Sequence, residues 1–185
     1  MKWGKSWILS ARPESPPIAV TDTEKNAVRI VAHEAHAARR GIFNGQSLSD
    51  ARALVPDLEC HSRDRSAEHE LLGSLAAWCE RYTPLVALDG EESLFMDVAG
   101  CTHLFGGEES FIADIETRLT AQGFTVRTCL ADTAGAAWAM ARHGIGRIIA
   151  SGQHAQAISA LPLAALRLDA ALVKSLGRVG FKTIG

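Results

Sequence analysis

Residues 82–100 have the sequence YTPLVALDGEESLFMDVAG, and this stretch decides the fold. Two short apolar runs, LVAL and SLFMDV, flank an Asp89-Gly90 pair, which tolerates the positive φ that tight hairpins require. The sequence therefore predicts a β-hairpin here. Its second strand is apolar without alternation, which is typical of a strand buried on both faces, so Leu94 and Met96 are predicted to be buried.

Helical patterns lie on both sides of this hairpin. Residues 66–83 begin with Ser66, a candidate N-cap, and place apolar side chains on one helical face: Leu71, Leu75, Trp78 and Tyr82. Residues 108–122 do the same before Gly123, with Phe111, Ile112, Ile115 and Leu119. Both segments are therefore predicted to be amphipathic helices that pack on a core.

The elements that follow the second helix indicate a fold that contains both helices and strands. The stretch FTVRTCLA (124–131) alternates like a strand, TAGAAWAMARH (133–143) is helical, and RIIA (147–150) is a short strand. This order predicts an α+β fold, in which residues 63–150 form a mostly antiparallel sheet with the helices 66–83 and 108–122 on one face.

The N-terminal third is predicted to be a separate small lobe. Residues 1–17 contain three prolines and no period, which indicates an irregular lead-in. Residues 18–62 then contain two short β segments, IAV and VRIV, a helix over 33–40 that stops at Gly41, and a short helix between Ser47 and Pro56.

The charge is distributed unevenly along the chain. Residues 1–140 contain 13 Lys and Arg against 20 Asp and Glu, whereas residues 141–185 contain six against one, a formal charge of +5. A basic end on an acidic body indicates a contact with a polyanion, and a solvated helix face is the alternative.

Composition excludes several classes of protein. The longest apolar runs are far shorter than the ~20 residues of a membrane span, and residues 1–20 lack the apolar stretch of a secretory signal. These features predict a cytoplasmic protein without membrane contact. The four cysteines show no CxxC spacing, so they are predicted to be buried free thiols, with neither a zinc site nor a disulfide framework. A metal-binding regulator would need His33, His36, Cys60 and His61, whose spacing is loose, so no metal site is predicted.

Four carboxylates surround the hairpin: Asp89, Glu91, Glu92 and Asp97. Polymerase-type phosphoryl transfer needs at least two carboxylates that converge on two Mg²⁺ ions. Charged residues beside a turn are also simply well solvated, and Asp97 on a buried strand is expected to make a structural hydrogen bond.

The order of motifs resembles a known family. DARALVPDL, WCERYTPLVALD, GCTHLFGGE, ADTAGAAWAMAR and VGFKTIG are similar to motifs of the Y-family (translesion) DNA polymerases, and most similar to the ImuB-like branch of the bacterial inducible mutagenesis cassette. The resemblance runs from about Pro17 to Gly185. It implies a small helical fingers-like lobe at 18–62, a palm-like domain at 63–154 and the truncated start of a helix-hairpin-helix-like thumb at 155–185.

The resemblance also implies which residues would be catalytic. Anchored on FMDV, the family's adjacent metal-binding Asp and catalytic Glu fall on Glu92 and Ser93. A one-residue gap would instead bring Asp89-Gly90 close to those places, and it restores no pair of carboxylates. The segment MKWGKSWILSARPESP contains no Asp to stand for the first metal-binding Asp. The fingers Tyr and Arg that bind triphosphate fall on Ala35 and Ala38. The palm lysines fall on Trp138 and Ala134, and the candidates to replace these cations are Arg39, Arg40 and Arg142.

These substitutions predict a non-catalytic Y-family-like subunit that binds DNA and acts as a scaffold in damage-induced translesion synthesis and mutagenesis. No catalytic residue and no cofactor is assigned. The alternative is an active translesion polymerase with a rearranged, Mg²⁺-dependent site. DNA contacts are expected from Arg167, Lys174, Arg178 and Lys182, although the thumb's first Gly-x-Gly is replaced by Arg167-Leu168-Asp169. The resemblance further implies a sliding clamp, a separate replicative-type polymerase and a recombinase-like cassette protein as partners, bound through segments beyond the thumb.

Overall fold

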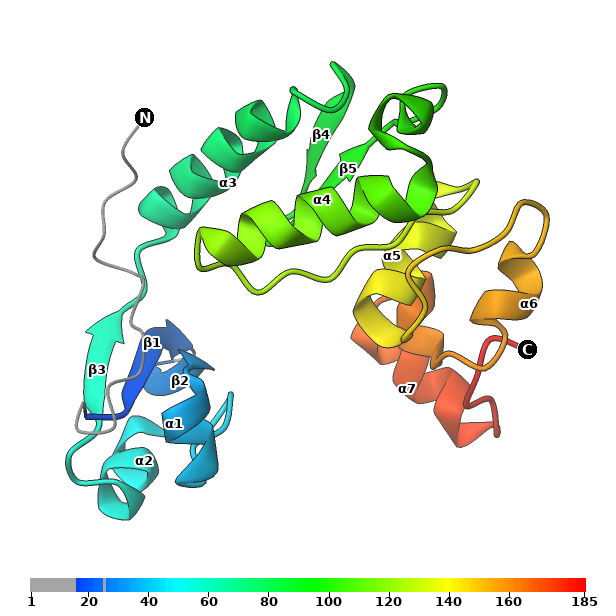
Figure 1. The fold of residues 1–185 in the computed structure, drawn as a ribbon. Helices are drawn as coiled ribbons and strands as arrows, with labels where there is room; N and C mark the ends of the chain where they lie inside the picture. Colours follow the sequence, from blue (N-terminus) through cyan, green and yellow to red (C-terminus); the bar gives the residue numbers. More distant parts are fainter. Residues whose placement is uncertain (1–15, 25) are drawn as a thin grey trace. The chain divides into compact units, whose positions relative to one another are not determined.

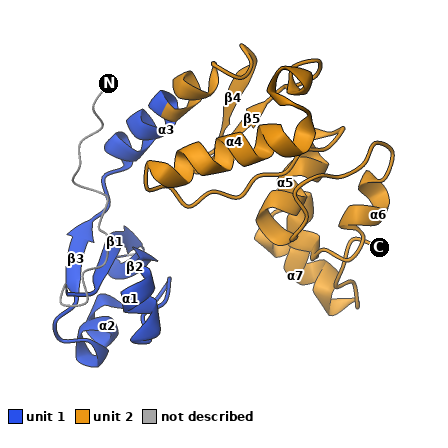
Figure 2. Ribbon diagram, viewed as in Figure 1, with its two compact units in different colours: residues 1–74 blue, residues 75–185 orange. Residues whose placement is uncertain are grey.

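The computed structural model describes residues 16–24 and 26–185, so most of the predicted lead-in lies outside the described residues. The chain divides into two compact units, residues 1–74 and 75–185, and the helix α3 (Arg65–Cys79) runs across the division (Figure 2). Each unit has its own hydrophobic core.

The first unit contains a three-stranded sheet. Strands β1 (Ile18–Glu24) and β2 (Ala27–His33) form the predicted antiparallel pair, and β3 (Glu59–Ser62) adds in parallel to the other edge of β1 (Figure 1). The strand order is therefore β2-β1-β3. The sequence did not predict β3, because its parallel pairing depends on a partner about 40 residues away rather than on a local turn.

Two short helices complete this unit. α1 (Ala35–Arg39) ends before Gly41, whose φ of +88° is the left-handed closing conformation that was predicted. α2 (Leu48–Leu54) begins at Ser47, whose Oγ accepts a hydrogen bond from the Asp50 N–H at 3.1 Å. The core between the sheet and these helices consists of Ala19, Ile30, Ala37, Ile42, Ala51, Val55 and Leu58.

The helix α3 is shorter at its end than the sequence predicted. Its N-cap is Asp64 and not the predicted Ser66, because the Asp64 side chain accepts a hydrogen bond from the Ala67 N–H at 3.0 Å. The helix ends at Cys79. Pro84 disfavours helical backbone in the residue before it, and the Arg81 side chain satisfies the Trp78 carbonyl at 3.0 Å. Tyr82 therefore lies in the turn after the helix.

The second unit is built around the predicted hairpin. β4 (Val86–Asp89) and β5 (Ser93–Met96) pair antiparallel, and α4 (Glu108–Ala121) runs beside them (Figure 1). All four residues of β5, Leu94 and Met96 included, are half-buried rather than fully buried. Met96 packs against the core of this unit, and the predicted burial of the strand on both faces is therefore only partial.

An aromatic cluster forms the centre of this core. Phe111, Ile112, Ile115 and Leu119, all predicted from the period of α4, are at most 5% exposed. The Tyr82 ring lies 5.4 Å from Phe111 and 5.2 Å from Phe105, centroid to centroid. The Tyr82 hydroxyl donates a hydrogen bond to Asp114 at 2.7 Å, which satisfies the polar end of this buried side chain.

Tyr82→Phe is expected to reduce the free energy of unfolding by ~1 kcal/mol at neutral pH, because the hydroxyl contact to a charged acceptor is lost. Hydrogen bonds from Arg118 and then Tyr82 hold the pKa of Asp114 below its usual value. This carboxylate therefore contributes stability above its unfolded pKa, which is lost as pH falls through the folded pKa. NMR titration should show a higher Asp114 pKa in the variant, and urea unfolding should show a smaller difference from wild type in acid. An unchanged Asp114 pKa would contradict the assignment.

The sheet of this unit is smaller than predicted. Residues 124–131 are extended, and Phe124, Val126 and Leu130 pack on the core, but the segment makes only one bridge, a parallel one between Leu130 and Ile148. The alternation correctly predicted which side chains point inward. Among the described residues no neighbouring strand pairs with the rest of this backbone, so the broad antiparallel sheet does not form. The α+β class itself is confirmed.

The C-terminal part is helical. It contains α5 (Ala134–His143), α6 (His154–Ile158), a 3₁₀ turn at Leu163–Leu166 and α7 (Ala170–Arg178). Leu161, Ala165 and Ala139 pack together, which attaches the segment after residue 155 to α5. In the described part of the chain, no helix has the length and apolar character needed to cross a membrane.

Candidate functional site

The hairpin on which the resemblance places the family's catalytic motif has a tight turn. Asp89 is the last paired residue of β4, opposite Ser93, and Gly90, Glu91 and Glu92 form the turn between them. Gly90 has a φ of +65°, the positive value that the Asp-Gly pair was predicted to allow. Asp89 is therefore a strand residue and not, as predicted, a turn residue.

Two of the hairpin carboxylates are engaged by arginines. Arg142, near the end of α5, lies with its Nη2 2.6 Å from Glu92 Oε2. Arg167, which follows the 3₁₀ turn Leu163–Leu166, lies with its Nη2 2.6 Å from Asp89 Oδ1. The Asp89 side chain is only 16% exposed, so this carboxylate is mostly buried where it meets Arg167.

Trp138 lies beside both arginines. The Arg142 and Arg167 guanidinium carbons are 5.6 Å and 5.0 Å from the centre of its ring, within the range of cation–π attraction. The indole in turn packs against the cluster of Ala139, Leu161 and Ala165. An aromatic ring and two arginines thus occupy the region where the resemblance requires a lysine and open carboxylates.

The donors present do not fit a two-metal site. A bound Mg²⁺ needs oxygen lone pairs that converge and are not already engaged by a cation. Here Asp89 and Glu92 each pair with a guanidinium, and Ser93 provides a hydroxyl where a second carboxylate is required. The described residues also contain no group of three or more His, Cys, Asp and Glu placed to hold a metal. His33, His36, Cys60 and His61 are thus not placed to hold a metal together.

Asp97 makes the structural hydrogen bond that was predicted. Its Oδ1 accepts from the Ala99 N–H at 3.0 Å, and its carbonyl accepts from the Thr83 hydroxyl at 2.6 Å. The side chain is exposed, because β5 ends at Met96, so the predicted burial of Asp97 is wrong.

The two fingers positions that the resemblance points to lie in the first unit. Ala35 and Ala38 are both exposed residues of α1, and their methyl groups offer nothing to a triphosphate. Of the arginines considered as replacements, Arg40 pairs with Asp57 at 2.7 Å and Arg142 with Glu92 at 2.6 Å. Arg39 is exposed.

Three basic residues of the C-terminal segment remain available. Of the six after residue 140, Arg142, Arg147 and Arg167 form ion pairs with carboxylates. Lys174, Arg178 and Lys182 are exposed, and the described residues provide no ion-pair partner for them. Lys174 and Arg178 are four residues apart in α7 and therefore share a helix face. A DNA contact from Arg167 would have to compete with its ion pair.

The turn before α7 keeps a glycine-like backbone without glycine. Arg167 has a φ of +60°, in the left-handed region, although its side chain disfavours this conformation. Asp169 then caps α7 by accepting from the Leu172 N–H at 2.8 Å, and Gly180, with a φ of +101°, closes the helix. The replaced Gly-x-Gly therefore retains the turn at its first position, which the sequence did not predict.

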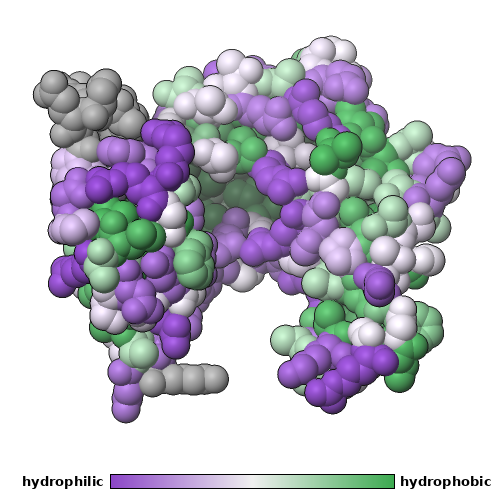
Figure 3. Space-filling view, turned by 90° about the horizontal axis from the view of Figure 1, so that it is seen from below, coloured by the Kyte–Doolittle hydropathy of each residue, from purple (hydrophilic) through white to green (hydrophobic). Residues whose placement is uncertain are grey.

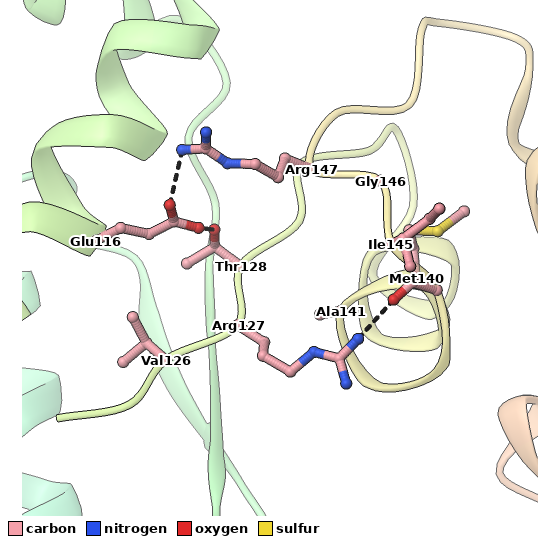
Figure 4. Close-up of a pocket in the computed structure, with 10 residues that line it drawn as sticks. Glu116, Val126, Arg127, Thr128, Met140, Ala141, Ile145, Gly146 and Arg147 are labelled. Carbon is pink, nitrogen blue, oxygen red and sulfur yellow. Dashed lines mark hydrogen bonds and ion pairs between the residues drawn. The ribbon is translucent and has the colours of Figure 1, made fainter. Parts of the chain in front are cut away.

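A separate cavity of about 160 Å³ lies beside the end of α5 (Figure 4). Its polar side chains are largely satisfied within the protein. Glu116 accepts from the Thr128 hydroxyl and pairs with Arg147 at 2.8 Å, while Arg127 donates to the carbonyls of Arg142 and Gly144. These contacts cap the C-terminus of α5 and hold it near α4. The sequence contained no local signal for this network, because its members come from three segments.

Comparison with known proteins decides the identity of this arrangement. Residues 5–142 match the sequence profile of the impB/mucB/samB family, which is most of the chain. The chain belongs to the impB/mucB/samB family. The predicted resemblance to Y-family polymerases is therefore confirmed.

Individual members of the impB/mucB/samB family differ in how much they share with this chain. Protein ImuB of Caulobacter vibrioides is 46% identical over 146 residues, which are 78% of this chain and 32% of that protein. DNA polymerase IV 2 of Mesorhizobium japonicum is 30% identical over 115 residues, 62% of this chain and 26% of that protein. The chain thus spans about a third or less of the length of these relatives.

Solved structures show that the fold is that of Y-family polymerases. The insertion ternary complex of Dbh DNA polymerase matches 95% of this chain and 54% of its own, with a TM-score of 0.74 at 13% identity. DinB from Sulfolobus solfataricus matches 95% of this chain and 53% of its own, with a TM-score of 0.68 at 14% identity. At this level of identity the likeness concerns the fold alone.

Proposed function

We propose that this chain is part of a non-catalytic, polymerase-like subunit that binds DNA and acts as a scaffold in damage-induced translesion synthesis and mutagenesis. The similarity to ImuB and to DNA polymerase IV 2 supports the link to this process. The exposed cations Lys174, Arg178 and Lys182 support a contact with the DNA backbone, which basic side chains bind irrespective of sequence.

One observation carries the non-catalytic part of the proposal. The position of the metal-binding Asp holds Glu92, which is bound to Arg142, and the position of the catalytic Glu holds Ser93. A neutral hydroxyl does not supply the negative charge of a carboxylate, and a guanidinium paired with the remaining carboxylate competes with a divalent cation for it. The chain itself is therefore proposed to need no cofactor.

The partners in this proposal follow from a subunit that does not itself polymerise. A separate replicative-type polymerase would carry out synthesis, with a sliding clamp and a recombinase-like cassette protein in the same assembly. The resemblance assigns these contacts to segments beyond the thumb. DNA is the partner that the described residues can bind themselves.

Primer extension tests the proposal. Purified protein with primer-template DNA, four deoxynucleotides and either Mg²⁺ or Mn²⁺ is expected to add no nucleotide, because Glu92 is paired with Arg142 and Ser93 carries no charge to hold the two ions. A polymerase IV preparation in the same buffer is the positive control. Template-dependent extension that disappears in Glu92→Ala would instead establish the alternative, an active polymerase with a rearranged metal site.

A further inference from the structure

We propose that Arg142 and Arg167 are built-in counter-cations of the hairpin. They neutralise Glu92, where the resemblance implies a divalent metal ion, and the neighbouring Asp89, and they clamp the hairpin to α5 and to the start of the C-terminal segment. This inference rests on the proposed function, in which the hairpin is a vestigial catalytic motif. It adds that the lost metal site has been replaced by a specific internal structure, called here the arginine clamp: Asp89, Glu92, Trp138, Arg142 and Arg167.

The geometry of the two ion pairs is the first support. Each guanidinium nitrogen lies 2.6 Å from its carboxylate oxygen, the short distance of a charge-assisted hydrogen bond. Arginine does not lose its proton in proteins, so the compensation persists at every pH at which the carboxylates are charged. A divalent ion would have to displace a permanent cation from each carboxylate.

The position of Trp138 is the second support. Its ring lies within 5.6 Å of both guanidinium carbons and is held by the apolar cluster of Ala139, Leu161 and Ala165. A fixed aromatic surface restricts the two long side chains to orientations that reach the hairpin, which lowers the entropy lost when the pairs form. The residue that replaces the family's lysine thus has a role in the clamp.

The backbone at Arg167 is the third support. Glycine adopts a φ of +60° without steric cost, whereas an arginine does so only at a cost in stability. A residue held in a disfavoured conformation persists when the surrounding structure compensates for it. The contacts of the Arg167 side chain with Asp89 and Trp138 provide this compensation, which a glycine could not.

The clamp connects parts of the chain that are far apart in sequence. Arg167 is 78 residues from Asp89, and Arg142 is 50 residues from Glu92. Because Asp169 caps α7 only two residues after Arg167, the clamp also orients the helix that carries Lys174 and Arg178. Arg167 is accordingly a positioning residue for the end of the basic segment, the name used here for residues 141–185.

Metal titration tests the first half of the inference. Wild type, the double variant Arg142→Gln with Arg167→Gln, and the control Arg40→Gln are titrated with Mn²⁺ and followed by electron paramagnetic resonance and by urea unfolding. Arg40 is a half-buried arginine that pairs with Asp57 at 2.7 Å outside the clamp. Only the double variant is expected to bind a single Mn²⁺ ion saturably and to gain stability from it, because only there are Asp89 and Glu92 without a paired guanidinium. Saturable binding by wild type, or no binding by the double variant, would overturn the proposal.

Glycine substitution tests the second half and keeps the inference falsifiable without any metal. Arg167→Gly relieves the backbone but leaves the mostly buried Asp89 without a partner, so the folding equilibrium constant is expected to fall by about tenfold. Asn26→Gly is the matched control, because Asn26 is the other described non-glycine residue with a positive φ, +63°, and it makes no clamp contact. The stability of the Asn26→Gly variant should be unchanged or higher than that of wild type. An Arg167→Gly variant as stable as wild type would show that the residue serves only the turn.

These measurements contain no DNA and no nucleotide, so their outcome is separate from that of the proposed function. Primer extension by wild type would reject the proposed function even if both clamp tests gave the expected results. Conversely, saturable Mn²⁺ binding by wild type without primer extension would reject the clamp alone.

Discussion

Replacing Lys174, Arg178 and Lys182 together by alanine is expected to flatten the salt dependence of DNA binding by about 2 to 3 units of slope. Each phosphate contact releases counterions and contributes roughly −0.9 to the slope of log affinity against log salt on duplex DNA. The structure strengthens the case for these three residues, because the other arginines of the basic segment already pair with Glu92, Glu116 and Asp89.

The structure also changes the expected contribution of the hairpin to this binding. From sequence alone, the acidic hairpin should repel the DNA backbone. Arg142 and Arg167 offset the charges of Glu92 and Asp89, so the repulsion is expected to be weaker than the composition indicates. The same pairs withdraw two cations from the DNA surface, which leaves binding by the wild-type chain in the ~10⁻⁴ to 10⁻⁶ M range of non-specific contacts.

Titration of a labelled duplex at several salt concentrations measures the slope for each variant. Arg52→Ala is the control, since it removes an exposed cation of α2 outside the basic segment and should leave the slope unchanged. An unaltered slope in the triple variant would mean that these side chains only solvate a helix face.

Phe111→Ala is expected to lower the free energy of unfolding by about 3 to 5 kcal/mol, the usual cost of removing a buried aromatic side chain and leaving a cavity. Phe111 is 2% exposed and contacts the rings of Tyr82 and Phe105, with centroids 5.4 Å and 5.3 Å away. These two neighbours come from separate parts of the chain, the turn after α3 and the 3₁₀ helix Thr102–Phe105, so closing the cavity would require both to move. A loss of this size is a large part of the 5 to 15 kcal/mol that stabilises a typical domain.

Urea unfolding followed by circular dichroism measures this loss. Phe43→Ala is the control, because Phe43 is 60% exposed and its truncation should change stability by less than about 0.5 kcal/mol. Phe111→Leu, which keeps most of the apolar volume, should lose less than the alanine variant. A cost below about 1 kcal/mol for Phe111→Ala would contradict the placement of α4 on the core of this unit.

The sequence by itself determined the elements whose signals are local. The Asp89-Gly90 pair specified the hairpin, Ser47 specified the start of α2, and the spacing of Phe111, Ile115 and Leu119 specified the buried face of α4. Each depends on residues within about one or two turns of one another, where backbone preference and hydrophobic period act directly. The order of motifs likewise predicts that Glu92 and Ser93 stand at the family's catalytic positions.

Only the tertiary structure decided which distant groups meet. The alternation of residues 124–131 predicted inward side chains, but strand pairing needs a neighbouring backbone, and among the described residues only Ile148 bridges to Leu130. The strand β3 was not predicted for the converse reason. It pairs with β1, and nothing in its own four residues indicates that partner. The arginine clamp depends in the same way on contacts across 50 and 78 residues. The sequence shows which residues are charged. The path of the chain in three dimensions determines which carboxylate lies close enough to an arginine to form an ion pair.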